Sequence, residues 1–476
     1  MRAHTTWLTE DEKRLIVGEA LEILATVGFR AAHSRVLPLL ADAGAAVDLD
    51  SGLVHLPPEL VRGALSRCPR SFLMAGASPE HDVVLGEGRP YRFTPSGCAA
   101  KTVDYVTGER RASTLEDVRL ATALNDSLPE LGLMWTMVSA TDVPIERREL
   151  IEYYTILRET DKHVTFVDCP SEVAAVKRIF EVLAGDLERF RERPRVSTLV
   201  TAASPLQVDG RVLDVHVAMA ECGAPVKVYS MTSAGATSPV TIAGTVTQGV
   251  AEFLAIATML QVAVPGTRVV FCCGSGILDM RQTTFSIGCL ENSMISVAAT
   301  EVGHHLGVPT MNPAMSTDAR YPGIQAGYEK ALKALTVCSA NPDLVSGWGL
   351  IDSSSALYLP QIVIDNEIAL MVRRMLGEIE VSEASIMHDA FARVGIGGDF
   401  LREKETARRA RAGEHFLPQI ANRLSYEKWQ ETGETEDDAA RAVIDRVMAA
   451  RADRRPSLSD DQLAELAAIC GVETPA

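Results

Sequence analysis

Eight short apolar runs recur along the middle of the chain, and each is followed by enough residues to form one helix. The runs lie at Tyr91–Gly97, Leu131–Ala140, His163–Cys169, Arg195–Ser204, Pro225–Thr232, Arg268–Ser275, Pro309–Ser316 and Leu344–Gly349. Strands that alternate with helices pair in parallel through right-handed crossovers. Eight such units in about 280 residues match a closed (β/α)8 barrel in number and length, so an α/β fold of the TIM type is predicted.

The segments between the runs carry signals of helix starts and ends. Ser113-Thr-Leu-Glu116 has the spacing of a capping box, Pro239 suits the first turn of a helix, and Gly307 ends an apolar stripe. A doubly wound open sheet is the alternative fold. Such a sheet normally carries a glycine-rich phosphate loop after its first strand, and Phe93-Thr-Pro-Ser-Gly97 lacks that pattern. We therefore favour the barrel.

Two flanking regions complete the predicted organisation around a barrel at 91–376. Residues 1–90 are expected to form an N-terminal helical cap, because apolar residues recur at helical spacing between Glu12 and Gly28. Residues 377–476 are charged and helical in pattern. We expect this C-terminal helical extension to cover the barrel or to form a subunit interface in a homo-oligomer.

Composition limits the partners and the compartment. The chain has 46 Lys and Arg against 63 Asp and Glu, a net charge of −17, so nucleic acid and anionic membranes would repel it. The nine cysteines are scattered and form no CxxC pair. We therefore expect no metal site and a reducing, cytoplasmic location. We expect no signal peptide, and no stretch of about 18 uncharged apolar residues occurs, so we do not expect a membrane protein.

In barrel enzymes, chemistry takes place at the C-terminal ends of the strands and in the loops that follow. Here these positions hold aromatic residues after strands one, two and eight, and acidic and basic residues after strands six and seven. The candidate residues are Phe93, Trp135, Trp348, Asp279, Arg281, Asp318 and Arg320. Ring faces hold a quaternary ammonium, and arginine binds a carboxylate with two hydrogen bonds. The pattern predicts a site for a zwitterion such as a betaine. The alternative is that the charged residues are ion pairs that fix the loops.

Two other polar residues are weaker candidates. Lys227 lies in the fifth strand, where some barrels carry a Schiff-base lysine, but its place at the strand start predicts a side chain in solvent. Glu252 interrupts an apolar helix and is expected to be a charge on the helix face or a contact in an interface.

A series of motifs runs through most of the chain in a fixed order. These are Gly235–Gly244 followed by Ala251-Glu252, Asp279-Met280-Arg281, Asp318 followed by Gln325–Lys330, Gln361–Glu367, and Leu424–Trp429. In this order and at these spacings the chain resembles the trimethylamine methyltransferase family of corrinoid-dependent enzymes, in the branch without pyrrolysine that includes glycine betaine methyltransferases. It departs from the family pattern at Gln282-Thr283, where that pattern has Thr-Gly.

The resemblance implies a (β/α)8 barrel, in agreement with the strand count. It also implies transfer of a methyl group from a quaternary amine, glycine betaine or a similar betaine, to the Co(I) of a cobalamin-type corrinoid on a partner protein. A quaternary ammonium leaves as a neutral tertiary amine, so this chemistry needs no general acid. The residue that replaces pyrrolysine is not assigned.

Other functions also remain open at this point. A zinc-dependent methyltransferase would need a His/Cys ligand set at the strand ends, which the sequence does not offer. A lysine-dependent barrel lyase would use Lys227. A non-catalytic amine-binding barrel would keep the ligand site but would have lost the partner protein that accepts the methyl group.

Overall fold

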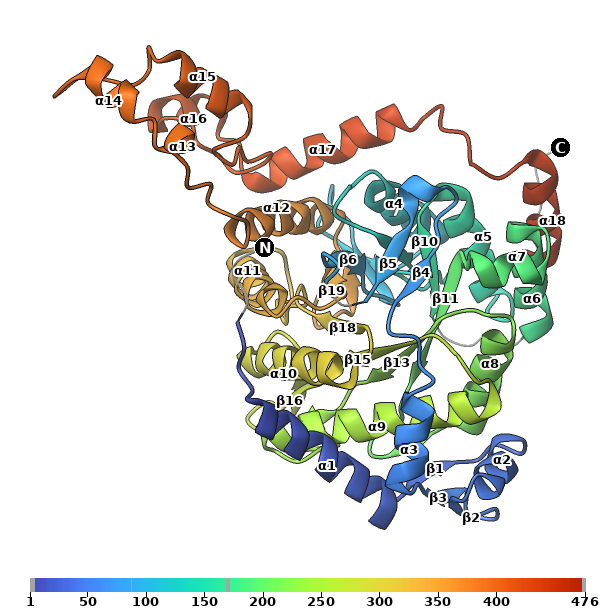
Figure 1. Cartoon of the computed structure of the whole chain (residues 1–476). Helices are drawn as coiled ribbons and strands as arrows, with labels where there is room; N and C mark the ends of the chain where they lie inside the picture. The colour runs from blue at the N-terminus through green and yellow to red at the C-terminus, as the bar shows by residue number, and fades with distance from the viewer. Residues whose placement is uncertain (1–4, 87, 168–171, 473–476) are drawn as a thin grey trace.

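The computed structural model describes residues 5–86, 88–167 and 172–472, and its centre is a parallel barrel (Figure 1). The barrel strands are β6 (Arg92–Pro95), β9 (Leu133–Trp135), β10 (His163–Val167), β11 (Val196–Thr201), β13 (Val226–Ser230), β15 (Val269–Cys273), β18 (Thr310–Pro313) and β19 (Leu344–Trp348). They pair in the order β6-β19-β18-β15-β13-β11-β10-β9. An isolated parallel bridge between Phe93 and Leu131 completes the ring between β6 and β9. All eight predicted strands are confirmed, and Asp168 and Cys169 lie outside the described residues.

Helices follow the strands and form the outer layer of the barrel. They are α4 (Leu115–Asp126), α5 (Arg148–Glu159), α6 (Val173–Ala184), α7 (Leu187–Glu192), α8 (Gly210–Glu221), α9 (Ile242–Ala263), α10 (Leu290–Leu306), α11 (Ile324–Ser339) and α12 (Leu359–Met375). The capping box of α4 lies one residue later than predicted, on Thr114 and Asp117. Gly307 ends α10 in the left-handed conformation, as predicted.

The N-terminal region is more than the helical cap we expected. Its helices α1 (Glu10–Thr26), α2 (Val36–Asp42) and α3 (Pro58–Leu65) enclose three short strands, β1 (Phe29–Ala31), β2 (Ala46–Asp48) and β3 (Leu53–His55). β1 pairs in parallel with β12 (Gln207–Val208), which follows barrel strand β11. This pairing attaches the N-terminal sheet to the barrel.

A hairpin closes the N-terminal end of the barrel. It consists of β4 (Phe72–Met74) and β5 (Val83–Leu85). The side chains of Phe72, Met74, Val83 and Leu85 share one apolar cluster with barrel-interior residues such as Leu133 and Met311. The opposite end, where the strands terminate, is therefore the accessible one.

Helix α9 explains the most apolar stretch of the sequence. It is long and apolar enough to cross a membrane by length and composition, but 89% of its most apolar window is buried inside the protein. α9 packs against α1, α3 and α10 and so serves as a core helix.

The C-terminal region divides into an arm and a clasp (Figure 1). The arm comprises α13 (Glu383–Ile386), α14 (His388–Val394), α15 (Lys404–Arg411) and α16 (Tyr426–Thr432), and it extends away from the barrel. The clasp comprises α17 (Glu436–Ala450), which packs on α12, and α18 (Asp460–Cys470), which packs on α5 and α6. Between 377 and 434 only Ala390 and Ile420 are buried, so the arm has almost no core of its own.

Candidate active site

A cavity of about 350 Å³ lies at the mouth of the barrel, where the strands end. Its walls combine aromatic rings, hydroxyl groups and small apolar side chains. They are formed by Ser96, Gly97, Cys98, Trp135, Val167, Leu199, Thr201, Tyr229, Met231, Phe285, Ile287, Ser316, Ser353 and Ser354. None of these described lining residues carries a charge at neutral pH. The cavity is therefore suited to a ligand that is held by ring faces and hydroxyl groups.

Each of the three aromatic rings in the wall packs against a glycine. A Cβ atom at Gly97 would lie 2.6 Å from Trp135 Nε1, and one at Gly274 would lie 2.0 Å from the Tyr229 hydroxyl oxygen. A Cβ atom at Gly276 would lie 3.0 Å from Phe285 Cε2 and 2.1 Å from a backbone oxygen. The three strand-end glycines thus make room for the rings, because real Cβ atoms do not approach other atoms so closely.

Only one of the three expected aromatic residues, Trp135, lines the cavity. Phe93 and Trp348 are fully buried in the cluster that joins the strands to α4, α11 and α12, and their ring centroids lie 5.4 Å apart. Successive residues of a strand point to opposite faces, and these two point to the helices. The structure therefore removes Phe93 and Trp348 from the expected aromatic wall.

Asp318 binds the loops around the mouth together. Its carboxylate accepts hydrogen bonds from the Ser286 hydroxyl, from the Ile287 N–H at 3.1 Å and from the Ser353 hydroxyl at 2.7 Å. Burial alone would raise the pKa of Asp318, but these hydrogen bonds outweigh it and hold the pKa below its usual value. Ile287 and Ser353 line the cavity, so Asp318 positions the wall and does not itself belong to it.

Arg320 has a related role at an unusual turn. Both Arg320 and Arg110 form ion pairs with Asp352. Asp352, Ser353 and Ser354 have φ values of +55°, +51° and +67°, a left-handed conformation that non-glycine residues adopt only at a cost. The ion pairs and the Asp318 contact hold this turn so that two of its serines line the cavity.

Asp279 and Arg281 lie on a hairpin beside the mouth. The Asp279 carboxylate accepts hydrogen bonds from the N–H groups of Arg281 and Gln282, at 2.8 and 3.1 Å, and forms the turn between β16 (Gly276–Asp279) and β17 (Thr284–Ser286). The Arg281 side chain is exposed. Thr283 in this turn is left-handed, with φ +58°. The hairpin brings Phe285 into the cavity, and neither Asp279 nor Arg281 lines it.

The later family motifs form a buried framework behind the mouth. Asp365 accepts hydrogen bonds from Lys330 Nζ at 2.7 Å, from the Gly349 N–H at 2.7 Å and from Gln361 Nε2 at 2.8 Å. Lys330 and Asp365 are both fully buried. Glu252, expected on a helix surface, is also fully buried and accepts hydrogen bonds from Ser204 and Ser230. These motif residues therefore hold the loops.

Lys227 differs from its predicted position. Its side chain is fully buried inside the barrel, so the expectation that it points to solvent is wrong. Its Nζ donates to Thr165 Oγ1 at 2.7 Å and lies 5.3 Å from the centroid of the Trp135 ring. Lys227 itself does not line the cavity. Burial lowers its pKa to about 8.

Sequence reasoning missed two of the three rings, Tyr229 and Phe285. Alternation in the fifth strand could have found Tyr229, because Lys227, Tyr229 and Met231 share one face. No comparable signal marks Phe285, whose place depends on the hairpin.

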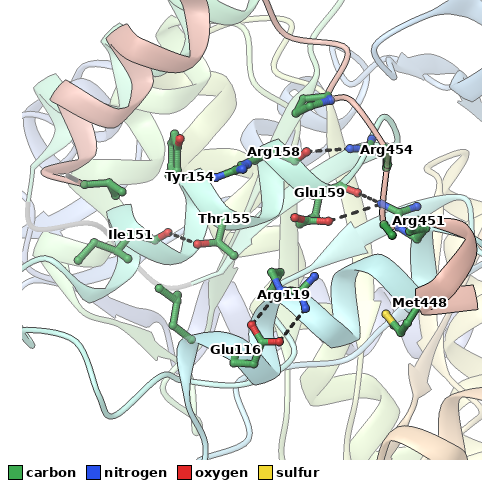
Figure 2. Close-up of a pocket in the computed structure, with 14 residues that line it drawn as sticks. Glu116, Arg119, Ile151, Tyr154, Thr155, Arg158, Glu159, Met448, Arg451 and Arg454 are labelled. Carbon is green, nitrogen blue, oxygen red and sulfur yellow. Dashed lines mark hydrogen bonds and ion pairs between the residues drawn. The ribbon is translucent and has the colours of Figure 1, made fainter. Parts of the chain in front are cut away.

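A larger cavity of about 570 Å³ lies outside the barrel, between α4, α5 and the C-terminal clasp. Its arginines are engaged with neighbouring groups (Figure 2): Arg119 pairs with Glu116, Arg451 lies 3.7 Å from Glu159, and Arg454 donates to the Arg158 carbonyl. The contacts of Arg451 and Arg454 with α5 fasten the clasp to the barrel. Within 5–86, 88–167 and 172–472, no three His, Cys, Asp or Glu side chains are grouped so that they could hold a metal ion.

Comparison with known proteins agrees with this architecture. A family model described as trimethylamine methyltransferase (MTTB) matches residues 2–470. Trimethylamine methyltransferase MttB of Desulfitobacterium hafniense (strain DSM 10664 / DCB-2) is 27% identical over 89% of this chain and 85% of its own length. Glycine betaine methyltransferase of Desulfitobacterium hafniense (strain Y51) is 29% identical over 89% of this chain and 88% of its own.

Solved structures show the same fold. This chain is similar to the crystal structure of the hydroxylamine MtmB complex. The superposition covers 98% of this chain and 89% of the MtmB chain, with a TM-score of 0.54 and 12% sequence identity. The matched segment of the family model includes the barrel, most of the N-terminal region and the whole C-terminal arm. The chain therefore belongs to the trimethylamine methyltransferase family.

Proposed function

We propose that this protein transfers a methyl group from a quaternary amine, glycine betaine or a similar betaine, to the Co(I) of a corrinoid carried by a partner protein. The observation that carries the proposal is the cavity at the barrel mouth, whose described lining residues are uncharged and include the rings of Trp135, Tyr229 and Phe285. Relatives named trimethylamine methyltransferase and glycine betaine methyltransferase support this reaction class.

The wall matches the chemistry of a quaternary amine. Such an ammonium has no N–H to donate, so hydrogen-bond acceptors cannot recognise it, whereas the electron-rich ring faces can. The hydroxyl groups of Ser96, Thr201 and Ser316 can donate to a carboxylate at the other end of a betaine. The leaving group is a neutral amine, so the wall needs no general acid.

The open end of the barrel fits a corrinoid protein as the methyl acceptor. Exposed apolar side chains lie on the loops around the mouth: Met231, Val240, Met280 and Tyr321. Co(I) supplies the nucleophile when the partner docks there. The residues of this chain bind the amine, direct a methyl group outward and exclude water.

A homo-oligomer formed through the C-terminal arm is part of the proposal. The arm exposes apolar residues that include Phe391, Ile396 and Leu401, and α11 exposes Ile324, Tyr328 and Leu332 four residues apart on one face. A partner that is always present would cover both. Tyr328→Glu should then lower the sedimentation coefficient of the assembly, and an unchanged coefficient would argue against this interface.

A cytoplasmic location is likewise proposed. The eight described cysteines are all free thiols, which suits a reducing compartment. Because Lys227 does not reach the cavity, the structure favours methyl transfer over the lysine-dependent lyase.

The test is spectroscopic. Purified protein and reduced cobalamin are mixed with glycine betaine, carnitine, proline betaine, choline or trimethylamine, and conversion of Co(I) to methyl-Co(III) is followed. We expect conversion with a betaine. Ligand binding without conversion for every amine would favour the amine-binding barrel instead.

A further inference from the structure

A directed chain of hydrogen bonds runs through the barrel below the cavity. Lys227 Nζ donates to Thr165 Oγ1 at 2.7 Å, and the hydroxyls of Thr165 and Ser197 lie 3.1 Å apart. Ser197 Oγ lies 2.9 Å from His163 Nε2, and His163 Nδ1 lies 3.1 Å from the Ala75 carbonyl oxygen. A carbonyl only accepts, so Nδ1 donates, Nε2 accepts from Ser197, and Ser197 accepts from Thr165.

Among the residues that the structure describes, no acceptor in this chain carries a charge that could balance that of Lys227. Every acceptor along the chain is neutral, and burial together with the Lys227 charge lowers the pKa of His163 to about 3. Among the residues that the structure describes, no carboxylate forms an ion pair with Lys227. Lys330, another fully buried lysine, does have such a partner in Asp365. An unpaired buried cation is costly unless a negative group comes near it.

The Trp135 ring separates this cation from the cavity. Lys227 Nζ lies 5.3 Å from the ring centroid, and the ring lines the cavity wall. A second cation against the same ring would be repelled by the first, since the two charges would be separated by little more than the ring. Tyr229 and Phe285, the other two rings, are therefore the better surfaces for an ammonium.

We propose that Lys227 is a positioning residue that selects quaternary amines bearing a carboxylate and turns that carboxylate toward the Trp135 side of the cavity. The trimethylammonium group then lies against Tyr229 and Phe285, with a methyl group toward the open mouth. This inference rests on the proposed function and specifies its substrate class. The protein prefers zwitterions to simple cations, although no described residue of the cavity wall is charged.

The test compares glycine betaine with choline, which carries a hydroxymethyl group in place of the carboxylate. Dissociation constants are measured by calorimetry for the wild type, for Lys227→Met and for Lys162→Met. Lys162 is the matched control, because it is also a buried lysine but donates to the carbonyls of Asn125 and Leu128, outside the cavity wall.

We expect Lys227→Met to weaken glycine betaine binding by about tenfold, the effect of one charge acting over several ångströms in a protein interior. Choline binding should stay the same or tighten, and Lys162→Met should leave the ratio of the two constants unchanged. Equal changes for both ligands in Lys227→Met would overturn the proposal. If Lys227→Met does not fold, the wild-type protein still tests the proposal, because equal wild-type affinities for glycine betaine and choline would contradict the proposed preference for zwitterions.

The outcome is separable from that of the proposed function. A protein that binds glycine betaine with this Lys227-dependent preference but methylates no cobalamin would refute the methyl transfer and leave the inference intact. Methyl transfer from choline and glycine betaine alike would support the reaction and refute the role of Lys227.

Discussion

Two sets of residues lie side by side at the ends of the barrel strands, and they differ in kind. The cavity wall is aromatic, hydroxylated and, in its described residues, uncharged. The loops around it contain Asp318, Arg320 and Asp352, whose charges are engaged with one another or with loop hydroxyls. Charged groups near the strand ends therefore hold the loops of this site, whereas the neutral rings are the groups proposed to bind the ligand.

The largest effect is expected from Asp318→Ala. The variant loses hydrogen bonds to Ser286, Ile287 and Ser353, and bonds to a charged group contribute about 1.5–3 kcal/mol each. We expect the free energy of unfolding to fall by about 4.5 kcal/mol, the lower end of the sum of three such bonds, and amine binding to be lost with it. Urea unfolding and calorimetry measure the two effects. Asp279→Ala, which removes only an exposed turn contact, is the control, and equal losses in both variants would break the comparison.

The next effect is a pH dependence below the cavity. Burial holds the pKa of His163 at about 3 in the folded protein, whereas an unfolded histidine titrates near 6.5. Between these two pKa values His163 binds a proton in the unfolded state but not in the folded state. The free energy of unfolding therefore falls as the pH falls from about 6.5 to 3. The slope is about 1.4 kcal/mol per pH unit for this group, or about 2 kcal/mol at pH 5.

The measurement is urea unfolding of the wild type and His163→Gln at pH 7 and pH 5. The variant should lose less stability between the two values than the wild type does. Parallel losses in the two proteins would show that His163 does not remain neutral in the barrel.

A smaller, ligand-specific effect is expected from Phe285→Ala. Phe285 is only partly buried, so its loss should change the unfolding free energy little. The loss of one ring face should weaken the binding of a quaternary ammonium by about tenfold. Calorimetry with glycine betaine measures the change. Phe391→Ala on the arm is the control and should leave affinity unchanged. Unaltered affinity in Phe285→Ala would remove this ring from the site.

The smallest effect concerns the hairpin beside the mouth. Thr283 is left-handed at φ +58°, which a β-branched residue adopts with strain, so Thr283→Gly should raise the unfolding free energy by up to about 1 kcal/mol. Arg281→Ala on the same hairpin should change neither stability nor affinity, because its side chain is exposed. Thermal melting checks both. A lower unfolding free energy in Thr283→Gly would show that a contact of the Thr283 side chain stabilises the protein by more than its left-handed backbone conformation costs.

The sequence predicts the barrel well because strand count and alternation are local properties. Cys272 and Cys273 illustrate this, since one faces the barrel interior and the other the helices, as alternation requires. The N-terminal sheet is harder to predict, because β1 pairs with β12, which lies far away in the sequence and is not indicated by any local pattern.

The cavity at the strand ends shares only Trp135 with the residues that the sequence indicates as a site, and their role in binding stays a prediction. Trp135 lines the cavity, but Phe93 and Trp348 point to the helix layer, a choice of face that depends on the exact strand register and on the irregularity between Val345 and Trp348. The charged residues were correctly placed in the loops after strands six and seven. Their partners, Ser353 and Asp352, come from a turn after the eighth strand that no local pattern indicates.

We propose that the aromatic wall of the cavity, and not the charged loops around it, binds the quaternary amine. The most direct measurement is a crystal structure of the protein with glycine betaine. We predict the trimethylammonium group between Tyr229 and Phe285 at the barrel mouth, with the carboxylate on the Trp135 side. Glycine betaine bound instead against Asp318 and Arg320, or in the arginine-lined cavity between α4 and α5, would contradict the account.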